Sequence, residues 1–156
     1  MNCKPTSGER ELLSQLIKDF EKEGKRVWAL KKMKAVHPII ECSARELGKL
    51  EPIRFIKLKE DEIIASNEVE GIKIKNPVAK PFHPTAIGVH LIYDFKSKTL
   101  EFSQLNSAIK GWGEKMVKAG LVSLPKDWKV LLVFDWSNGF WKRMQQKHPQ
   151  VEWFQI

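Results

Sequence analysis

The sequence predicts one α+β domain, residues 1–156, with a mixed, mostly antiparallel sheet, packed helices and a C-terminal α-β-α-β portion. Three observations predict this fold class. Apolar residues near the N-terminus recur at helical intervals, the middle third alternates as strands do, and the last third, from about Asn106, reads as helix, strand, helix, strand. The length of 156 residues is typical of one domain.

The first predicted element is an amphipathic helix over about 8–23. Thr6 and Glu9 have the spacing of a capping box, and Gly24 offers a C-cap. The segment that follows fits a short buried strand or a second helix. We favour a strand at 27–30, because its Val-Trp pair suits extended backbone.

The next segment is predicted to begin with a short helix and to continue as strands. Ser43 and Glu46 form another capping box, which predicts a helix near 44–50. The run 53–58 is typical of a strand, and a second strand is expected to begin at Ile63, after a charged turn.

Residues 76–86 contain three prolines, so we expect no regular structure there. The strict alternation over 89–95 predicts a strand that turns at 96–98 and returns through 100–102. This pattern is typical of a β-hairpin.

The last third has the most regular pattern. Asn106 or Ser107 is expected to cap a helix, and the apolar run 130–134 predicts a buried strand. Asp135 follows that strand directly. A second capped helix and a final strand over 151–156 complete the predicted fold.

Composition and charge limit the function classes. The net charge is +8, and residues 76–156 hold 11 basic against 6 acidic groups, whereas residues 1–75 hold 16 against 13. No apolar run is long enough to span a membrane, and early charged residues argue against a secretory signal. With only Cys3 and Cys42, we expect reduced thiols, a cytoplasmic location and no membrane partner.

The positive excess leads to the first hypothesis, a nucleic-acid-associated protein that binds DNA or RNA. Aromatic rings interleaved with Lys and Arg form stacking platforms for bases, and basic groups attract phosphates. A solubilising charge and core tryptophans are the structural alternative. The predicted binding residues are Lys126, Trp128, Lys129, Trp141, Lys142, Arg143 and Lys147.

The second hypothesis is a metal-dependent nuclease or phosphoesterase with Asp135 and Asp94 as catalytic carboxylates. A β-meander followed by α-β-α-β resembles the topology of ribonuclease H-like nucleases, and this resemblance implies carboxylates that hold divalent ions. Mg²⁺ is expected only under this hypothesis; otherwise the sequence predicts no metal site and no cofactor. The structural alternatives are a helix cap for Asp135 and a hairpin charge for Asp94.

The third hypothesis is a protein-interaction or small-ligand-binding module built on the proline-rich loop 76–86. Lys80, Phe82 and His83 would supply charge, stacking and hydrogen bonding there, although a rigid connector explains the loop equally well. The sequence contains no P-loop, no GxGxxG and no GxSxG motif. ATP-driven, Rossmann-type and α/β-hydrolase functions are therefore not expected.

Overall fold

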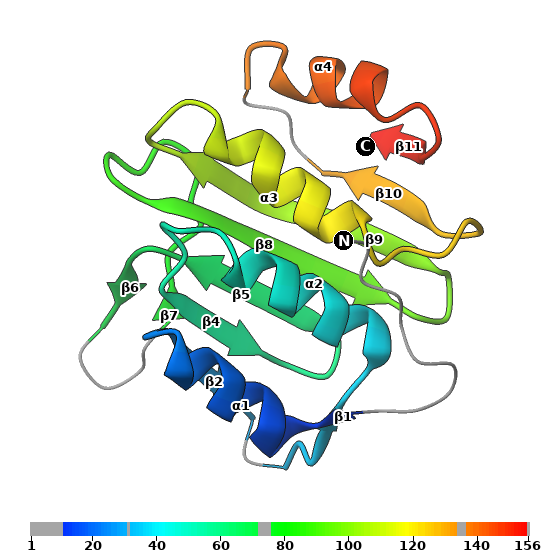
Figure 1. Ribbon diagram of the computed structural model, residues 1–156. Coiled ribbons are helices and arrows are strands. Elements are labelled where there is room, and N and C mark those ends of the chain that lie inside the picture. The colour runs from blue at the N-terminus through cyan, green and yellow to red at the C-terminus, as the bar shows by residue number, and fades with distance from the viewer. Residues whose placement is uncertain (1–10, 31, 72–75, 134–136, 156) are drawn as a thin grey trace.

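The computed structural model describes residues 11–30, 32–71, 76–133 and 137–155. In these residues, four helices pack on a seven-strand mixed sheet of order β11-β10-β9-β8-β5-β4-β2 (Figure 1). The helices are α1 (Leu13–Lys22), α2 (Pro38–Gly48), α3 (Trp112–Leu121) and α4 (Phe140–Lys147). The strands of the sheet are β2 (Arg26–Ala29), β4 (Phe55–Leu58), β5 (Glu62–Ser66), β8 (Ile87–Asp94), β9 (Thr99–Ser107), β10 (Lys129–Leu132) and β11 (Glu152–Gln155). Two short ribbons pair β1 (Glu11–Leu12) with β3 (Ala35–Val36), and β6 (Val69–Glu70) with β7 (Asn76–Pro77).

The centre of the sheet is an antiparallel meander of β4, β5, β8 and β9. Parallel pairs flank it, since β2 runs parallel to β4, and both β10 and β11 continue parallel to β9. Parallel neighbours require a crossover connection. The helices α2, α3 and α4 lie in the connections before β4, β10 and β11. The predicted α+β fold with a C-terminal α-β-α-β portion is therefore confirmed.

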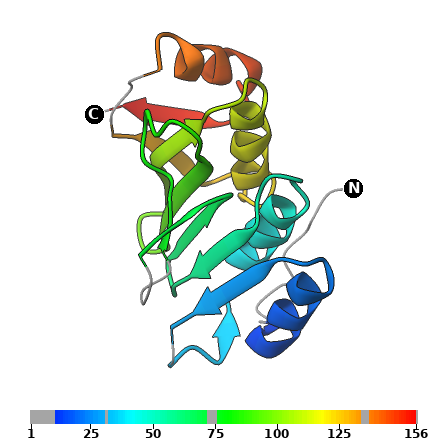
Figure 2. The same cartoon turned by 90° about the vertical axis from the view of Figure 1, so that its left-hand side faces the viewer.

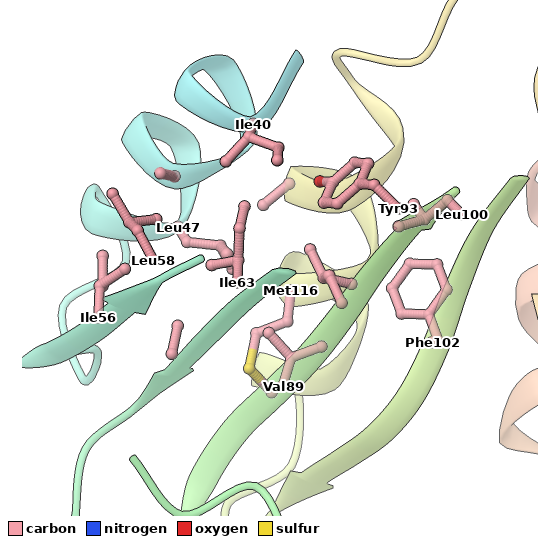
Figure 3. Close-up of a cluster of buried hydrophobic side chains, with 14 of the residues drawn as sticks. Ile40, Leu47, Ile56, Leu58, Ile63, Val89, Tyr93, Leu100, Phe102 and Met116 are labelled. Atoms are coloured by element: carbon pink, nitrogen blue, oxygen red, sulfur yellow. The ribbon is translucent and has the colours of Figure 1, made fainter. Parts of the chain in front are cut away.

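Helices α1, α2 and α3 lie on one face of the sheet (Figure 2). The core lies between them and the sheet. The labelled side chains in Figure 3 come from α2, α3 and the four meander strands and are all buried: Ile40, Leu47, Ile56, Leu58, Ile63, Val89, Tyr93, Leu100, Phe102 and Met116. Helix α4 joins this core through Trp141 and Met144, which are also buried.

Helix α2 corrects the predicted helix near 44–50. It begins at Pro38, because the Nδ1 atom of His37 accepts the N–H of Ile39 and a proline suits the first helical position. Ser43 is buried inside the helix, where its hydroxyl contacts the hydroxyl of Ser123 at 2.7 Å, so it does not act as a cap.

Strand β9 corrects the predicted helix start at Asn106 or Ser107. The strand continues through both residues, and α3 begins only at Trp112, after Gly111 with a φ of 102°. Asn106 is buried, and its carboxamide bonds the backbone of the loop before β8. A polar residue that resembled a cap therefore anchors a strand.

The other boundaries follow the sequence pattern with small changes. Helix α1 begins at Leu13 rather than near residue 8, and β10 ends at Leu132. Cys42 is buried on α2 and is disulfide-bonded, so the prediction of reduced thiols is wrong for it; Cys3 lies outside the described residues. Within the described ranges, no helix has the length and apolar character needed to cross a membrane.

Candidate ligand-binding cavity

A cavity of about 570 Å³ lies beside the far half of β9. Three elements and one loop surround it: β9, the start of α3, one side of α4 and the proline-rich loop. The volume falls within the range of small-molecule sites. Its lining residues are Pro81, Phe82, Phe102, Ser103, Gln104, Leu105, Asn106, Ser107, Lys110, Gly111, Gly113, Glu114, Ser137, Phe140, Trp141, Arg143, Met144 and Lys147.

The backbone edge of β9 forms one wall. Six consecutive residues, Phe102 to Ser107, line the cavity, although side chains alternate between the two faces of a strand. The cavity must therefore contact the strand along its edge as well as on a face. Among the described residues, β10 pairs with β9 only as far as Leu132 opposite Phe102, and no described strand pairs with the rest of this edge; Figure 1 shows β9 extending past β10.

A β-bulge sits at the point where the two strands part. On β8, His90 and Leu91 are adjacent, but their partners on β9 are Gln104 and Phe102, so Ser103 has no partner. A bulge leaves the extra residue's backbone groups outside the ladder and bends the strand. The bulge therefore lies in the same stretch of β9 that has no described partner strand on the β10 side and that lines the cavity.

The start of α3 forms the second wall. Gly111 precedes the helix in the left-handed region, and no side chain in the described part of the chain caps the first turn. The first N–H groups of a helix have no internal acceptor, and they carry the positive end of its dipole. A Cβ atom on Gly113 would lie 3.1 Å from the Cε1 atom of Phe140, so glycine permits the close approach of α4.

Helix α4 supplies an apolar floor and a basic rim. The Trp141 ring packs against the rings of Phe102 and Phe140, with centroid distances of 5.1 Å in each case. Arg143 and Lys147, one helical turn apart, are exposed at the rim. The cavity is thus apolar at its base and basic at its opening.

Some of the basic side chains at the opening of the cavity form ion pairs, and others do not. The Lys147 ammonium lies 3.0 Å from the Glu114 carboxylate, and this hydrogen bond holds the pKa of Glu114 below its usual value. Lys118 lies 4.0 Å from the same carboxylate. Lys110 and Arg143 have no acidic partner in the described part of the chain, so the described residues at the opening carry a positive excess.

The loop before β8 closes the last side, and Asn106 holds it there. The Asn106 Oδ1 atom accepts the N–H of Phe82 at 3.0 Å, while its Nδ2 atom donates to the carbonyl oxygens of His83 and Ala86 at 3.1 and 2.7 Å. The Phe82 side chain is 73% exposed at the cavity. Lys80 forms an ion pair with Glu70 at 2.8 Å and does not line the cavity.

The structure divides the predicted nucleic-acid-binding residues into two groups. Trp141, Arg143 and Lys147 line the cavity together with Phe82 from the predicted ligand loop. The second group lies away from it: Lys126, Trp128 and Lys129 stand at the amino end of β10, and Lys142 is exposed on α4 outside the lining.

Burial changes the expected role of both predicted tryptophans. Trp128 and Trp141 are each only 6% exposed, and Trp128 packs edge-on against Tyr93 and Phe95. Neither ring is available in this structure as an open stacking platform for bases. Lys129 is exposed, with its ammonium 5.3 Å from the ring centre of Phe154.

The two predicted catalytic carboxylates are not seen together. Asp94 ends β8, and its Oδ1 atom accepts the N–H groups of Lys96 and Ser97, both at 3.0 Å, as in a turn. Asp135 lies outside the described residues. Within those residues, no group of three His, Cys, Asp or Glu side chains could hold a metal ion.

A histidine–carboxylate contact occurs outside the cavity. His90 on β8 and Glu62 on β5 lie 2.6 Å apart, measured from Nε2 to Oε1, and neither residue lines the cavity. Among the described residues that line the cavity there is no histidine or cysteine, and the one carboxylate is Glu114. A reaction in this cavity would therefore rely on hydrogen-bond donors and positioning more than on a strong base.

Comparisons with protein-family models, with curated proteins and with solved structures give no match for this chain. They add nothing to the resemblance in topology to ribonuclease H-like nucleases. The cavity is therefore the feature of this chain that bears most directly on function. The sequence analysis did not select Ser103, Lys110, Gly111 or Gly113 as site residues. Lys110, Gly111 and Gly113 form a Lys-Gly-x-Gly segment at the start of a helix, and this pattern could have indicated them.

Proposed function

We propose that the chain binds an acyl-coenzyme A, or a related phosphopantetheine thioester, in this cavity and transfers the acyl group to a nucleophile. One observation carries the proposal: the open edge of β9 leads, within a few residues, to the uncapped start of α3. The strand edge suits an extended chain that contains amide groups, and the helix start suits phosphate groups. A ligand that contains both would fit this site.

The β9 edge supports the part of the proposal that concerns the amide chain. An extended molecule can add to an exposed strand edge through main-chain hydrogen bonds. The pantetheine arm is a thin, extended chain with amide groups, so it can take the place that a longer β10 would occupy. The apolar base formed by Phe102, Trp141 and Met144 suits its methylene and methyl groups.

The start of α3 and the basic rim support the phosphate part. Helix N-termini bind phosphate through backbone N–H groups and the helix dipole. Gly111 leaves open space there, because a Cβ atom at this position would meet nothing within 4 Å. Lys110 and Arg143, with no acidic partner among the described residues, add two charged donors.

The donors along β9 suit acyl transfer. A nucleophile attacks the thioester carbonyl, the C–S bond breaks, and the thiol leaves with the proton that the nucleophile gives up. Backbone N–H groups near the Ser103 bulge could stabilise the oxyanion that forms on the carbonyl oxygen. Glu114 forms an ion pair with Lys147, so it is a poor general base. A neutral primary amine needs little help from a base when it attacks a thioester. We therefore expect the acyl acceptor to be a primary amine.

The test is isothermal titration with coenzyme A, with acetyl-coenzyme A and, separately, with pantetheine. Arg143→Gln and Lys110→Gln should each weaken coenzyme A binding by about tenfold, since a hydrogen bond to a charged group contributes roughly 1.5 kcal/mol or more. Lys142→Gln is the matched control, because Lys142 is exposed on the same helix outside the cavity. Absence of coenzyme A binding, or equal effects of all three substitutions, would contradict the proposal.

Turnover is measured separately, as release of free thiol from acetyl-coenzyme A in the presence of primary amines. We expect release that depends on the amine and is lost when coenzyme A product saturates the cavity. Binding without any amine-dependent release would reduce the function to cofactor binding.

A second candidate is contact with a nucleic acid through phosphates. The observation that favours it is the run of exposed basic residues on α4, namely Lys142, Arg143 and Lys147, in a chain of net charge +8. Fluorescence anisotropy with a labelled oligonucleotide should then show affinity that falls steeply with salt. In this case Lys142→Gln would weaken binding as much as Arg143→Gln, which distinguishes it from the cavity proposal.

A further inference from the structure

Phe82 combines exposure with a backbone conformation that phenylalanine rarely adopts. Its φ is 66°, in the left-handed region, and its side chain is 73% exposed beside the cavity. A bulky residue in this region is an outlier, because its Cβ crowds the following carbonyl group. Such strain persists only where the surrounding structure enforces it, and it clusters at functional sites.

The loop is built to hold this conformation. The N–H of Phe82 donates a hydrogen bond to Asn106. Pro81 and Pro84 flank the Phe82-His83 pair and restrict the backbone dihedral angles of the loop. The Nδ1 atom of His83 accepts the N–H groups of Thr85 and Ala86 at 3.3 and 3.1 Å. Glycine would adopt this φ without strain, so a phenylalanine here is held in place against its own conformational preference.

The alternation of β9 places Phe82 on a different side of the strand from the proposed phosphate site. Leu105 faces α3, since its Cδ2 atom lies 3.5 Å from a Cβ built on Gly113. Its neighbours Gln104 and Asn106 therefore point to the other face, and Asn106 holds Phe82 there. Both neighbours line the cavity, so the cavity has a second portion formed by Gln104, Asn106 and Phe82.

We propose that Phe82 is the specificity-determining residue for the acyl acceptor and selects an amine that carries an aromatic or apolar group. This inference rests on the proposed function. With the thioester along the β9 edge and its phosphates at α3, the acceptor reaches the thioester carbonyl from the face of Gln104 and Phe82. The exposed ring contributes apolar contact there, and the Gln104 carboxamide offers a polar group beside the reacting amine.

The experiment compares 2-phenylethylamine with ethanolamine as acceptors of the acetyl group from acetyl-coenzyme A. The wild-type protein should favour 2-phenylethylamine in kcat/KM, and Phe82→Ala should reduce that preference by about tenfold, as expected for the loss of an apolar contact. The KM for acetyl-coenzyme A should stay unchanged, whereas a merely structural role would alter both. Phe82→Leu should restore part of the preference.

Phe82→Gly separates the ring from the strain. It removes the same contact as Phe82→Ala but relieves the left-handed backbone, so its melting temperature should equal or exceed that of the Ala variant while acceptor preference is equally lost. Lys98→Gly is the matched control: Lys98 has a φ of 54° in the β8–β9 turn, away from the cavity, and its replacement should leave acceptor preference intact.

The outcomes separate this inference from the function on which it rests. If acetyl-coenzyme A binds and transfers its acyl group, but Phe82→Ala keeps the wild-type preference, only the role of Phe82 is wrong. If acetyl-coenzyme A does not bind, the proposed function and this inference both fail. If acetyl-coenzyme A binds without turnover, titration of 2-phenylethylamine into the coenzyme A complex decides: binding that Phe82→Ala abolishes supports the inference, and no binding overturns it.

Discussion

The Lys147 ammonium on α4 lies 3.0 Å from the Glu114 carboxylate on α3 and joins the two helices at the opening of the cavity. Both side chains are partly exposed, so the pair contributes little to stability, at most about 1 kcal/mol. Its larger consequence is electrostatic. The Glu114 carboxylate neutralises the charge of Lys147 at the opening. On our proposal, this is where the phosphate groups bind.

The first prediction follows from that charge. Glu114→Gln should raise the affinity for coenzyme A by about threefold, and Lys147→Gln should lower it by a similar factor, because a unit charge near a partly exposed site contributes under 1 kcal/mol. Titrations at about 50 mM and 300 mM salt should show the difference shrinking at the higher concentration. Changes of the same sign in both variants would contradict a phosphate site at this opening.

Gly113 leads to the second prediction. A methyl group there would meet the Phe140 ring at 3.1–3.2 Å, and the ring lines the cavity. We expect Gly113→Ala and Gly113→Val to displace the ring into the cavity and to reduce coenzyme A affinity progressively, with a smaller effect on unfolding.

Gly48 provides the control for this prediction. A Cβ at Gly48 would lie 2.1 Å from a carbon of the buried Phe20 ring, far along the chain from the cavity. Gly48→Ala should therefore lower the free energy of unfolding by about 1–3 kcal/mol and leave ligand affinity unchanged.

The third prediction concerns Asn106, which satisfies three backbone groups of the loop. Asn106→Ala should lower the free energy of unfolding by about 3 kcal/mol, since it leaves buried donors and acceptors without partners. Denaturant unfolding measures the loss. Limited proteolysis should also show faster cleavage within 80–86, whereas cleavage there at the wild-type rate would mean that the loop is held by other contacts.

The fourth prediction is a pH dependence of the β8–β9 turn. Hydrogen bonds, chiefly from Ser97, hold the pKa of Asp94 below its usual value of 3.8. The stabilisation is therefore complete above pH 3.8 and is lost as the pH falls through the lower, folded-state pKa. Asp94→Ala should unfold more easily than the wild type at neutral pH, and the two melting curves should converge in acid.

The same variant bears on the nuclease hypothesis. Asp94→Ala should leave coenzyme A binding and acyl transfer unchanged, because Asp94 does not line the cavity. A magnesium-dependent phosphodiesterase activity that disappears in this variant would instead favour the carboxylate hypothesis.

Local patterns predicted most of the fold. The hairpin of β8 and β9 was predictable because alternation over 89–95 matches the period of a strand, and the C-terminal elements were predictable because their apolar runs end at glycine or proline. The two misplaced helix starts have one cause. Ser43 and Asn106 resemble helix caps, but tertiary partners on distant segments determine their conformation.

The candidate site was only partly predictable. Phe82, Trp141, Arg143 and Lys147 were all selected from the sequence, yet for two separate hypotheses, since nothing local shows that residues about 60 apart share one cavity. What brings them together is the place where β10 stops pairing with β9. That point depends on the register of two strands, and no single segment encodes it.

An unpaired strand edge is a hazard for any protein, because the strand of another molecule can add to it and begin aggregation. In this chain the open edge of β9 lies inside a cavity between α3, α4 and the loop that holds Phe82. We expect these walls to hinder the approach of another β-sheet while leaving room for one narrow, extended chain. On our proposal, the same walls that shield this edge from the strand of another molecule also limit what can bind along it to a small, extended ligand.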